Sequence, residues 1–375
     1  MNAVRRIGVL TGGGDAPGLN AVIRAVVKSC LLTHRVRVLG IHNGFSGLVE
    51  LKYRELDRGD IRGLLPRGGT VLGTTNRGNP FRYVYRRPDG KEEIIDATET
   101  VKSNFERLGL DALIVIGGDG SLSIGERFYR EHGLPIIGVP KTIDNDISAT
   151  DSTFGFATAL EVATGALDRL HTTAESHHRV MLLEVMGRDA GWIALHAGLA
   201  GGAHMVLIPE IPFRFEPLIA KIRARERLGR PFSLIVVAEG AAPHNGSQVF
   251  QGEDQVTGWK RLGGVSYQIG QEIAARSGYD VRVTVLGHIQ RGGTPVPRDR
   301  ILATRFGVEA VRLAVQQQWG QMVALHAGAI VSVPLAEAVG KLKRVEPEGQ
   351  LVAHARAIGI VFGDEDPEDV AATEG

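Results

Sequence analysis

Residues 7–18 read IGVLTGGGDAPG, a short apolar run that passes directly into three consecutive glycines. The same order recurs at Ala112–Ile116, which is followed by a glycine pair, and at Ile136–Val139, which is followed by the segment PKTIDND. Unbroken runs of aliphatic residues are typical of strands buried on both faces of a parallel sheet. Three further runs have this character: Val180–Val185, Leu234–Ala238 and Val281–Leu286.

Between these runs lie segments with helical periodicity. Apolar residues recur at the spacing of one helix face in residues 19–31 and again in residues 156–170. Strand, glycine loop, helix and strand form the βαβ unit, and its repetition predicts an α/β protein with doubly wound, mainly parallel sheets. Ligands of such folds bind at the carboxyl ends of the strands, where the glycine loops lie.

Composition and charge exclude several classes of protein. The 375 residues, 43% hydrophobic and 23% charged, are typical of a globular chain of about two domains. The 43 Lys and Arg nearly balance the 42 Asp and Glu, so we expect no nucleic-acid or membrane partner. With one cysteine, Cys30, no secretory signal and no long apolar run, the sequence predicts a cytoplasmic protein.

The first two glycine loops have the character of a phosphate site. Consecutive glycines at 12–14 let backbone N–H groups converge, and the following helix N-terminus adds partial positive charge. In the second loop, Gly117–Ser121, the carboxylate of Asp119 is placed to meet a Mg²⁺ ion on bound phosphates, and Gly120 lets a nucleotide lie against the backbone. The plainer alternatives are a tight turn that needs glycine for its dihedral angles and a helix-capping role for Asp119.

The third loop, residues 140–146, collects the groups that phosphoryl transfer to an alcohol requires. Asp144 is the candidate general base, and Asp146 would support its position or a metal ion. Lys141 supplies a cation and Thr142 a hydroxyl at the same place. A solvated turn with local caps is the alternative interpretation.

Further polar groups stand near the ends of the later strands. Four arginines and a histidine there are suited to clamping a phosphate dianion, because guanidinium groups pair with phosphate oxygens. A glutamate could hold sugar hydroxyls, and any single arginine is more often part of a surface ion pair. The residues are Arg179, Met186, Gly187, Arg188, Glu239, Arg282, His288 and Arg291.

Six motifs, taken in order, resemble those of the phosphofructokinase family of the bacterial type: GGGDAPGLNAVIR, GGDGS, PKTIDND, MGRDAGW, VAEG and GHIQRGG. The resemblance runs from about Ile7 to about Gly293 and continues more weakly toward residue 345. It implies transfer of the γ-phosphoryl group of ATP, with Mg²⁺ as cofactor, to the 1-hydroxyl of fructose 6-phosphate. The product would be fructose 1,6-bisphosphate, in glycolysis.

The resemblance also implies a role for each matching residue. Asp144 would act as base, assisted by Thr142, Asp146, Arg188 and Lys141. The donor would be bound by Gly14, Arg77, Gly118, Asp119, Gly120 and Ser121, with Asp119 on Mg²⁺. The sugar phosphate would be bound by Thr142, Asp144, Met186, Gly187, Arg188, Glu239, His288 and Arg291. Arg179 and Arg282 would reach into the site of a neighbouring subunit, which implies a homo-oligomer, either a tetramer or a dimer.

The family fold consists of two similar three-layer α/β domains with the active site in the cleft between them. We therefore expect a donor domain of residues 1–155 with about 290–345, and a fructose 6-phosphate domain of residues 156–289 with about 346–362. The residues alone favour a simple break near Thr150. Residues 363–375 are rich in Asp and Glu, so we expect a disordered tail there.

Two positions bear on the phosphoryl donor. Pyrophosphate-dependent members of the family carry aspartate at the position of Gly120 and lysine at that of Lys141, whereas the shorter ATP enzymes usually carry glycine at the latter. This chain is mixed. A carboxylate at 120 would repel the α-phosphate of a nucleotide, so Gly120 favours ATP, and pyrophosphate stays the alternative donor.

Two other classes of protein compete with this interpretation. A different kinase that shares only the GGDG loop would leave PKTIDND, MGRDAGW and GHIQRGG without a role. A non-catalytic phosphosugar-binding regulator would not need Asp119, Asp144 and Asp146, all of which are present.

Three features lie outside the shared catalytic motifs. Residues 79–93, with PDG near their end, predict a hairpin or a surface excursion, and residues 242–255 predict a polar loop; both are additional to the shorter enzymes. Arg24, Lys28 and Arg58 resemble part of the family's effector site. The later segment LGRPFS lacks the lysines expected there, so we expect weak or absent control by ADP and phosphoenolpyruvate.

Overall fold

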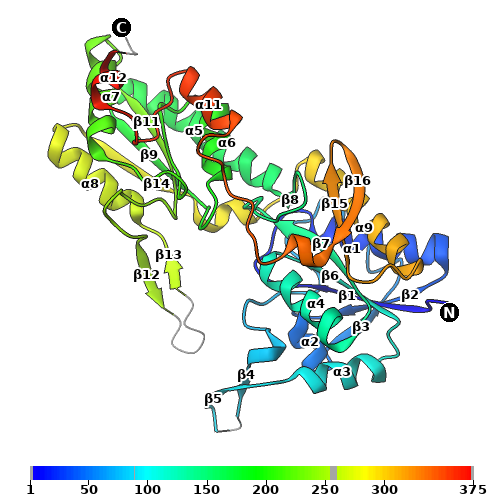
Figure 1. Cartoon of the computed structure of the whole chain (residues 1–375). Helices are drawn as coiled ribbons and strands as arrows, with labels where there is room; N and C mark the ends of the chain where they lie inside the picture. Colours follow the sequence, from blue (N-terminus) through cyan, green and yellow to red (C-terminus); the bar gives the residue numbers. More distant parts are fainter. Residues whose placement is uncertain (1–2, 88, 254–259, 373–375) are drawn as a thin grey trace. The chain divides into compact units, whose positions relative to one another are not determined.

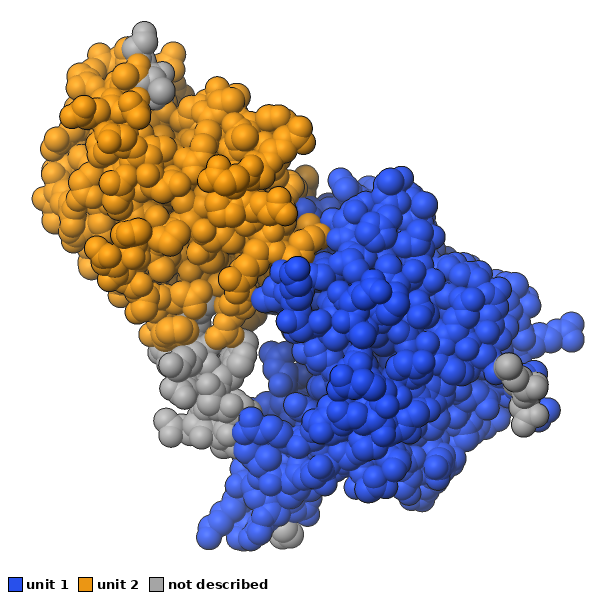
Figure 2. All heavy atoms as spheres, in the orientation of Figure 1, with its two compact units in different colours: residues 1–143, 147–158, 291–342 blue, residues 144–146, 159–290, 343–375 orange. Residues whose placement is uncertain are grey.

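The computed structural model describes residues 3–87, 89–253 and 260–372, and the chain divides into two compact units (Figure 2). Unit 1 comprises residues 1–143, 147–158 and 291–342, and unit 2 comprises residues 144–146, 159–290 and 343–375. The chain thus passes between the units several times, instead of once near Thr150. The assignment of the phosphoryl donor to one unit and of fructose 6-phosphate to the other stays a prediction.

Unit 1 is built on one mixed sheet (Figure 1). Its strand order is β16-β15-β7-β6-β1-β2-β3, with β8 paired to β7. The neighbours β2, β1, β6, β7 and β15 pair in parallel, and β3 and β16 join antiparallel at the two edges. The strands are β1 (Arg6–Thr11), β2 (Arg37–Ile41), β3 (Tyr53–Leu56), β6 (Ala112–Gly117), β7 (Ile136–Thr142), β8 (Phe154–Gly155), β15 (Gln321–His326) and β16 (Ala329–Pro334).

Helices cover both faces of this sheet, which gives unit 1 three layers. Along β1, Ile7 and Val9 belong to the core that includes residues of α1 and α9, whereas Leu10 belongs to the core that includes residues of α3 and α4. Alternate side chains of a strand point to opposite faces, so both faces are buried, as the unbroken apolar runs predict. The helices are α1 (Leu19–Ser29), which continues into a π-helix (Cys30–His34), α2 (Phe45–Val49), α3 (Thr98–Arg107), α4 (Asp119–His132), α9 (Pro297–Val315) and α10 (Leu335–Ala338).

Helix α9 joins the late segment of unit 1 to the earlier ones. A Cβ atom built on Gly307 would lie 2.7 Å from Cβ of Ala25, so glycine allows α9 to pack closely on α1. At the start of α9, the carboxylate of Asp299 accepts hydrogen bonds from the backbone N–H of Thr158 at 2.8 Å and from its hydroxyl at 2.6 Å. The three segments of the unit therefore form one packed body.

Unit 2 is built on a smaller sheet of four parallel strands, in the order β10-β11-β9-β14. Its core combines apolar residues of these strands with residues of α7 and α8. The elements are α5 (Phe156–His177, which begins in unit 1), β9 (Val180–Val185), α6 (Trp192–Ala200), β10 (Met205–Leu207), α7 (Phe215–Arg227), β11 (Ser233–Ala238), α8 (Val265–Ser277), β14 (Val281–Val285), a 3-10 helix (Gly287–Arg291), α11 (Gln350–Ala357) and α12 (Pro367–Ala372). Among the described residues, no helix is both long and apolar enough to span a membrane.

The structure confirms most of the predicted elements. All six apolar runs form strands, namely β1, β6, β7, β9, β11 and β14, and the two periodic segments form α1 and α5. Residues 79–93 contain a 3-10 helix (Pro80–Arg82) and the hairpin of β4 (Tyr83–Arg86) with β5 (Glu92–Ile95), as predicted.

The predicted polar loop at residues 242–255 is partly wrong. Its residues Phe250–Glu253 form β12, which pairs antiparallel with β13 (Lys260–Leu262). Residues 254 and 255 lie outside the described residues. The segment is therefore the first arm of a second hairpin for part of its length.

The predicted disorder of the tail from residue 363 is wrong as far as residue 372, and the last three residues lie outside the described ones. The tail forms α12, and Val370 of this helix is buried in the core of unit 2 with 3% of its surface exposed. One apolar residue therefore anchors a segment that is otherwise acidic.

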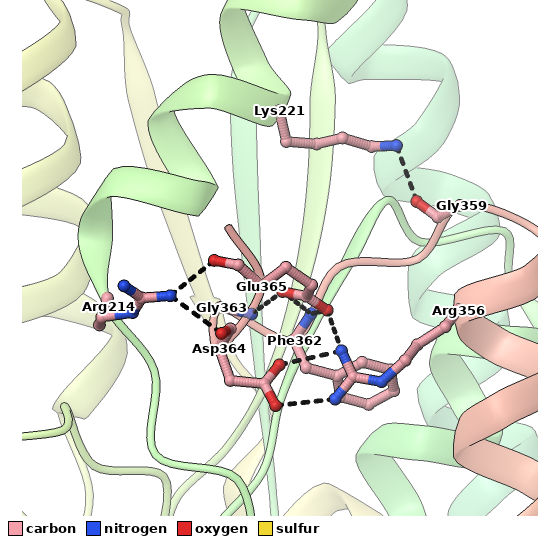
Figure 3. A network of polar contacts seen from close by, with 8 residues as sticks. All are labelled: Arg214, Lys221, Arg356, Gly359, Phe362, Gly363, Asp364 and Glu365. Carbon is pink, nitrogen blue, oxygen red and sulfur yellow. Dashed lines mark hydrogen bonds and ion pairs between the residues drawn. The ribbon is translucent and has the colours of Figure 1, made fainter. Parts of the chain in front are cut away.

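Polar contacts explain why the acidic residues before α12 are ordered (Figure 3). Arg356 forms hydrogen bonds with the carboxylate of Asp364 at 2.8 and 2.9 Å and also pairs with the carboxylate of Glu365. Arg214 donates to the backbone carbonyls of the same two residues at 2.9 and 2.7 Å. Arg356 thus pairs with the charges that composition alone associates with disorder, and Arg214, from a distant part of the chain, holds the backbone of the same residues.

The imidazole of His204, just before β10, is held as a neutral group. Its Nδ1 accepts a hydrogen bond from the backbone N–H of Leu234 at 2.9 Å, and its ring lies edge-on to that of Phe232. Burial, together with the positive charges of Arg225 and Lys221, lowers the pKa of His204 to about 3. In the unfolded chain the imidazole takes up a proton near pH 6.5. The contribution of neutral His204 to the free energy of unfolding is therefore fully present above that pH and is lost as the pH falls toward 3.

We predict that His204→Asn reduces the loss of stability at acid pH. The Oδ1 atom of asparagine can accept the same hydrogen bond but takes up no proton in this range. Between about pH 7.5 and about pH 5, the free energy of unfolding of the wild type should fall by about 2 kcal/mol more than that of the variant. Urea unfolding of both proteins at the two pH values measures this difference, and equal losses would contradict the assignment.

Candidate active site

Three loops of unit 1 meet at one edge of its sheet. The strands β1, β6 and β7 are parallel neighbours, and Gly117 pairs with Pro140 near their carboxyl ends. The glycine loop 12–14, the start of α4 and the end of β7 therefore lie next to one another. The backbone N–H of Gly12 donates to the carbonyl of Ile116 at 2.9 Å, which joins two of the loops directly.

The side chain of Ser121, in the first turn of α4, fills the space between two glycines. A Cβ atom built on Gly12 or Gly117 would collide with it. Gly13 has a φ of +76°, a backbone conformation that favours glycine. The glycines thus permit the turn and the close packing of Ser121. The N–H groups of Gly12 and Gly13 donate to the carbonyls of Ile116 and Thr75, and the phosphate role of the loop stays a prediction.

Lys141 is a buried cation at this edge, with 3% of its surface exposed. Strand β7 extends through Thr142, so Pro140, Lys141 and Thr142 belong to the strand and not to the predicted loop. Nζ of Lys141 donates a hydrogen bond to the carbonyl of Gly14 in the first glycine loop. The ammonium group therefore lies beside the loop that has the character of a phosphate site.

Asp119 is the first residue of α4, and it is not the residue that caps the helix. The N-cap is Gly118, which has no side chain to cap with, and Oδ1 of Asp119 accepts a hydrogen bond from the N–H of Gly340 at 3.0 Å. Gly120 is exposed, and a Cβ atom built there meets nothing within 4 Å. Position 120 therefore has room for a larger side chain, and the half-buried carboxylate of Asp119 stands next to it.

Two arginines of the predicted site also lie in unit 1. Nη1 of Arg291 donates to the carbonyl of Asp15 at 3.1 Å, and its guanidinium group packs against Gly14. The structure thus places Arg291 beside the first glycine loop, although the sequence groups it with the sugar phosphate. Arg77 is exposed and forms an ion pair with Glu92 of the β4–β5 hairpin at 3.5 Å.

A second group of loops meets at the carboxyl edge of the sheet of unit 2. The parallel neighbours β11, β9 and β14 are followed by Glu239, by Met186–Arg188 and by the 3-10 helix that contains His288. Backbone hydrogen bonds continue past the strand ends, from Glu239 N–H to the carbonyl of Val185 at 2.9 Å and from Gly240 N–H to that of Gly187 at 3.1 Å. The structure therefore brings together the sugar-phosphate candidates of these three loops.

Arg179 and Arg282 lie at the opposite edge of this sheet. Arg179 precedes β9 and Arg282 is the second residue of β14, so both stand at the amino ends of parallel strands. Each forms an ion pair with Asp280, at 2.6 Å for Arg179. The grouping of these two arginines with the other strand-end residues as one clamp is wrong within a single chain, while a role toward a neighbouring subunit stays a prediction.

The candidate base lies on a short segment, Asp144–Asp146, that belongs to unit 2. The backbone N–H of Lys343 donates to the carbonyl of Asp146 at 2.8 Å, and Nζ of Lys343 lies 3.3 Å from Oδ1 of Asn145. The carboxylates of Asp144 and Asp146 are half-buried. Sequence reasoning missed Lys343, because it stands far along the chain in a segment without a motif.

Glu184 is a second residue that sequence reasoning missed. It lies within β9, with 2% of its surface exposed, and its carboxylate accepts hydrogen bonds from the N–H groups of Gly264 at 3.0 Å and Ser266 at 2.9 Å. Glu184 therefore caps α8 from the neighbouring strand. The available signal was a single charged residue inside the otherwise apolar run of β9.

The predicted effector residues also come together. Arg24, Lys28 and Arg58 line a cavity of about 440 Å³, and Arg62 lines it too. Four basic side chains around one cavity favour an anionic ligand. Whether such a ligand controls the activity stays a prediction.

Sequence comparison relates the chain to known proteins. The sequence model of the family described as Phosphofructokinase matches residues 6–314. This chain belongs to the phosphofructokinase family. An ATP-dependent 6-phosphofructokinase of Chloroflexus aggregans is 57% identical over 362 residues, covering 96% of this chain and 98% of the relative. A pyrophosphate–fructose 6-phosphate 1-phosphotransferase of Streptomyces coelicolor is 49% identical over 359 residues, covering 96% of this chain and 100% of the relative.

A solved phosphofructokinase has a similar structure. The Pichia pastoris phosphofructokinase in the T-state matches with a TM-score of 0.75 and 36% identity, over 90% of this chain. The chain spans 38% of the length of that yeast chain. The similarity confirms the predicted fold class, an α/β protein of the phosphofructokinase fold.

We predict that Gly240→Ala destabilises unit 2, whereas Gly120→Ala leaves unit 1 as stable as before. A Cβ atom at Gly240 would collide with the carbonyl oxygen of Arg188, which is a backbone atom and cannot rotate away. Overpacking of this kind costs about 1–3 kcal/mol of unfolding free energy. Urea unfolding compares both variants with the wild type. A Gly240→Ala variant of wild-type stability would contradict the close contact between the two loops.

Proposed function

We propose that this protein is an ATP-dependent 6-phosphofructokinase, which transfers the γ-phosphoryl group of ATP to the 1-hydroxyl of fructose 6-phosphate. The observation that carries the proposal is the similarity, over nearly the full length of both chains, to the Chloroflexus relative of that name. The site supports it, because each of the six family motifs lies at the carboxyl end of a parallel strand, in the order β1, β6, β7, β9, β11 and β14. The product, fructose 1,6-bisphosphate, belongs to glycolysis.

Residues of unit 1 would bind the donor. The N-terminus of α4 and the backbone N–H of Gly14 would hold the phosphates of ATP, because the N–H groups of Gly12 and Gly13 already donate to the carbonyls of Ile116 and Thr75. The carboxylate of Asp119 fits Mg²⁺, because it is half-buried at the same edge and Mg²⁺ usually takes one or two carboxylates together with phosphate oxygens. The ion, when bound, neutralises charge on the phosphates. The donor residues would be Gly14, Arg77, Gly118, Asp119, Gly120 and Ser121.

The transfer step needs a base and cations. The carboxylate of Asp144 would accept the proton of the 1-hydroxyl of fructose 6-phosphate. The hydroxyl oxygen would attack the γ-phosphorus of ATP at the same time, and the bond between this phosphorus and ADP would break. Lys141 and Thr142 would stabilise the moving phosphoryl group, and Asp146 would support the position of the base. The sugar phosphate would be held by Met186, Gly187, Arg188, Glu239, His288 and Arg291.

Pyrophosphate is the second candidate donor. It is favoured by the buried ammonium of Lys141 beside the first glycine loop and by the similarity to the Streptomyces relative named for pyrophosphate. Gly120 argues for ATP, because the open space at this position leaves room for the α-phosphate of a nucleotide. We therefore assign ATP as the donor.

The proposal includes a homo-oligomer, either a tetramer or a dimer. Arg179 and Arg282 stand at the edge of the unit 2 sheet away from the sugar-phosphate loops of their own chain, and this position supports a role for them in the site of a second copy. The proposal also includes a cytoplasmic location, because the proposed reaction belongs to glycolysis.

We predict that Gly120→Asp removes ATP turnover without unfolding the protein. A Cβ atom at this position meets nothing within 4 Å, but the carboxylate beyond it would stand close to the α-phosphate. Two like charges about 4 Å apart near a protein surface repel by about 4 kcal/mol, a loss on the order of a thousandfold. The measurement is fructose 1,6-bisphosphate formation from fructose 6-phosphate and Mg²⁺, with ATP or pyrophosphate as the only donor.

The matched control for this experiment is Gly120→Ala, which adds a side chain without charge and should keep ATP turnover. Full ATP turnover by Gly120→Asp would contradict the role of this position in donor choice. Turnover of the wild type with pyrophosphate alone would replace ATP by the second candidate donor.

We predict that Asp144→Asn lowers kcat and leaves the binding of fructose 6-phosphate intact. An amide cannot accept the hydroxyl proton, and loss of a general base lowers kcat by on the order of a hundredfold to ten-thousandfold. Steady-state kinetics and direct binding of fructose 6-phosphate measure the two effects. The exposed Asp168 of α5 supplies the control variant, Asp168→Asn. A regulator without catalytic activity would give no turnover to lose.

A further inference from the structure

The loop after β9, residues 186–188, lies between two neighbouring loops at the carboxyl edge of unit 2. The loop after β11 begins with Glu239 and Gly240, and the loop after β14 includes Gly287. Two glutamine side chains, to which neither the motifs nor the proposed mechanism assigns a role, connect the central loop to its neighbours on both sides.

Gln290 connects the loops after β9 and β14. It is completely buried, its Oε1 accepts a hydrogen bond from the N–H of Met186 at 3.3 Å, and its Nε2 donates to the carbonyl of Gly287 at 3.0 Å. Both the oxygen and the nitrogen of the carboxamide are therefore hydrogen-bonded. Its orientation is fixed, because one backbone partner is a donor and the other is an acceptor.

Gln248 connects the loops after β9 and β11. Its Nε2 donates hydrogen bonds to the carbonyl of Arg188 at 3.0 Å and to that of Gly240 at 3.2 Å. The two amide hydrogens of one nitrogen can serve two acceptors. One side chain therefore bridges the backbone carbonyls of the two neighbouring loops.

The segment that carries Gln248 is itself attached to unit 2. The N–H of His244 donates to the carbonyl of Phe213 at 2.8 Å, and Val249 packs against the unit 2 core. The described residues 242–253 belong to a segment that the family resemblance implies to be additional to the shorter enzymes, and the sequence offers no function for it. Because the segment is attached to unit 2 on both sides of Gln248, the side chain of Gln248 can restrain the loops after β9 and β11.

We propose that Gln248 and Gln290 are positioning residues of the sugar-phosphate site, which fix the loop of Met186, Gly187 and Arg188 between its two neighbours. The inference rests on the proposed function, because that function assigns this loop to fructose 6-phosphate. Each glutamine acts through the backbone of residues that would bind the substrate. The additional segment 242–255 thereby contributes to substrate binding.

A neutral carboxamide suits this task better than a charged group. Gln248 faces two carbonyl oxygens, so a carboxylate in its place would be repelled by both and would add negative charge beside a bound phosphate dianion. A tilt of the peptide plane of Arg188 also moves its guanidinium group, and small displacements of a binding group weaken binding strongly. The hydrogen bonds to this peptide are therefore coupled to the affinity for the sugar phosphate.

Steady-state kinetics of Gln248→Met and Gln290→Met test the inference. Methionine keeps the length of each side chain but loses these hydrogen bonds. We expect the KM for fructose 6-phosphate to rise about tenfold in each variant, because two hydrogen bonds that hold the loop are lost. The KM for ATP should stay within about twofold of the wild-type value, and the midpoint of thermal unfolding should fall by only a few degrees.

The exposed Gln271 of α8 supplies the matched control, Gln271→Met, which should behave as the wild type. An unchanged KM for fructose 6-phosphate in folded Gln248→Met would overturn the inference. Equal rises of both KM values with a much lower unfolding midpoint would also overturn it, because they indicate a merely structural role. Should the variant at the fully buried Gln290 fail to fold, the half-buried Gln248 decides the question.

The same experiment separates this inference from the proposed function. Failure of the wild type to phosphorylate fructose 6-phosphate would overturn the proposed function and the inference that rests on it. Wild-type turnover together with unaltered kinetics of the variants would overturn the inference alone.

Discussion

Parallel pairing of adjacent strands is the constraint on which both groups of loops depend. Neighbouring parallel strands end at the same edge of a sheet, so the loops that follow them come together however far apart they lie in the sequence. In unit 1 this applies to the loops after β1, β6 and β7, and in unit 2 to the loops after β11, β9 and β14. The direction of the strands therefore determines which loops lie close together, and so which side chains can contribute to one site.

Close approach of these loops is the second requirement, and it explains why glycine gathers at the strand ends. Ser121 packs against Gly12 and Gly117, and the carbonyl of Arg188 packs against Gly240. A methyl group at Gly12 or Gly117 would collide with the side chain of Ser121, and one at Gly240 with the backbone carbonyl of Arg188. Glycine at these positions is therefore required by packing, whether or not an anion binds beside them.

The strands, the glycine loops and the position of most candidate residues at strand ends could be predicted, because they depend on local patterns of apolar runs and turn residues. The errors concern contacts between distant residues. Composition predicts a disordered tail, but Arg214 donates to the backbone carbonyls of Asp364 and Glu365, and no local pattern predicts a contact so far along the chain. Similarly, the sequence groups Arg179 and Arg282 with the other strand-end residues, and only the strand direction places them at the amino edge.

Gly240 and Gly120 differ in what surrounds them, so substitutions at the two positions should affect different properties of the protein. Gly240 lies in backbone contact with the neighbouring loop, so a side chain there displaces that loop, and the two glutamine carboxamides transmit the displacement to the other loops. Gly120 borders open space, so under the proposed function a side chain there would alter the charge that a donor meets without disturbing the fold. Relatives of this chain are named for different donors. An open position beside the proposed phosphate site would give a physical reason, because one substitution there could alter the fit of the donor, whereas the packed loops of unit 2 can change only together.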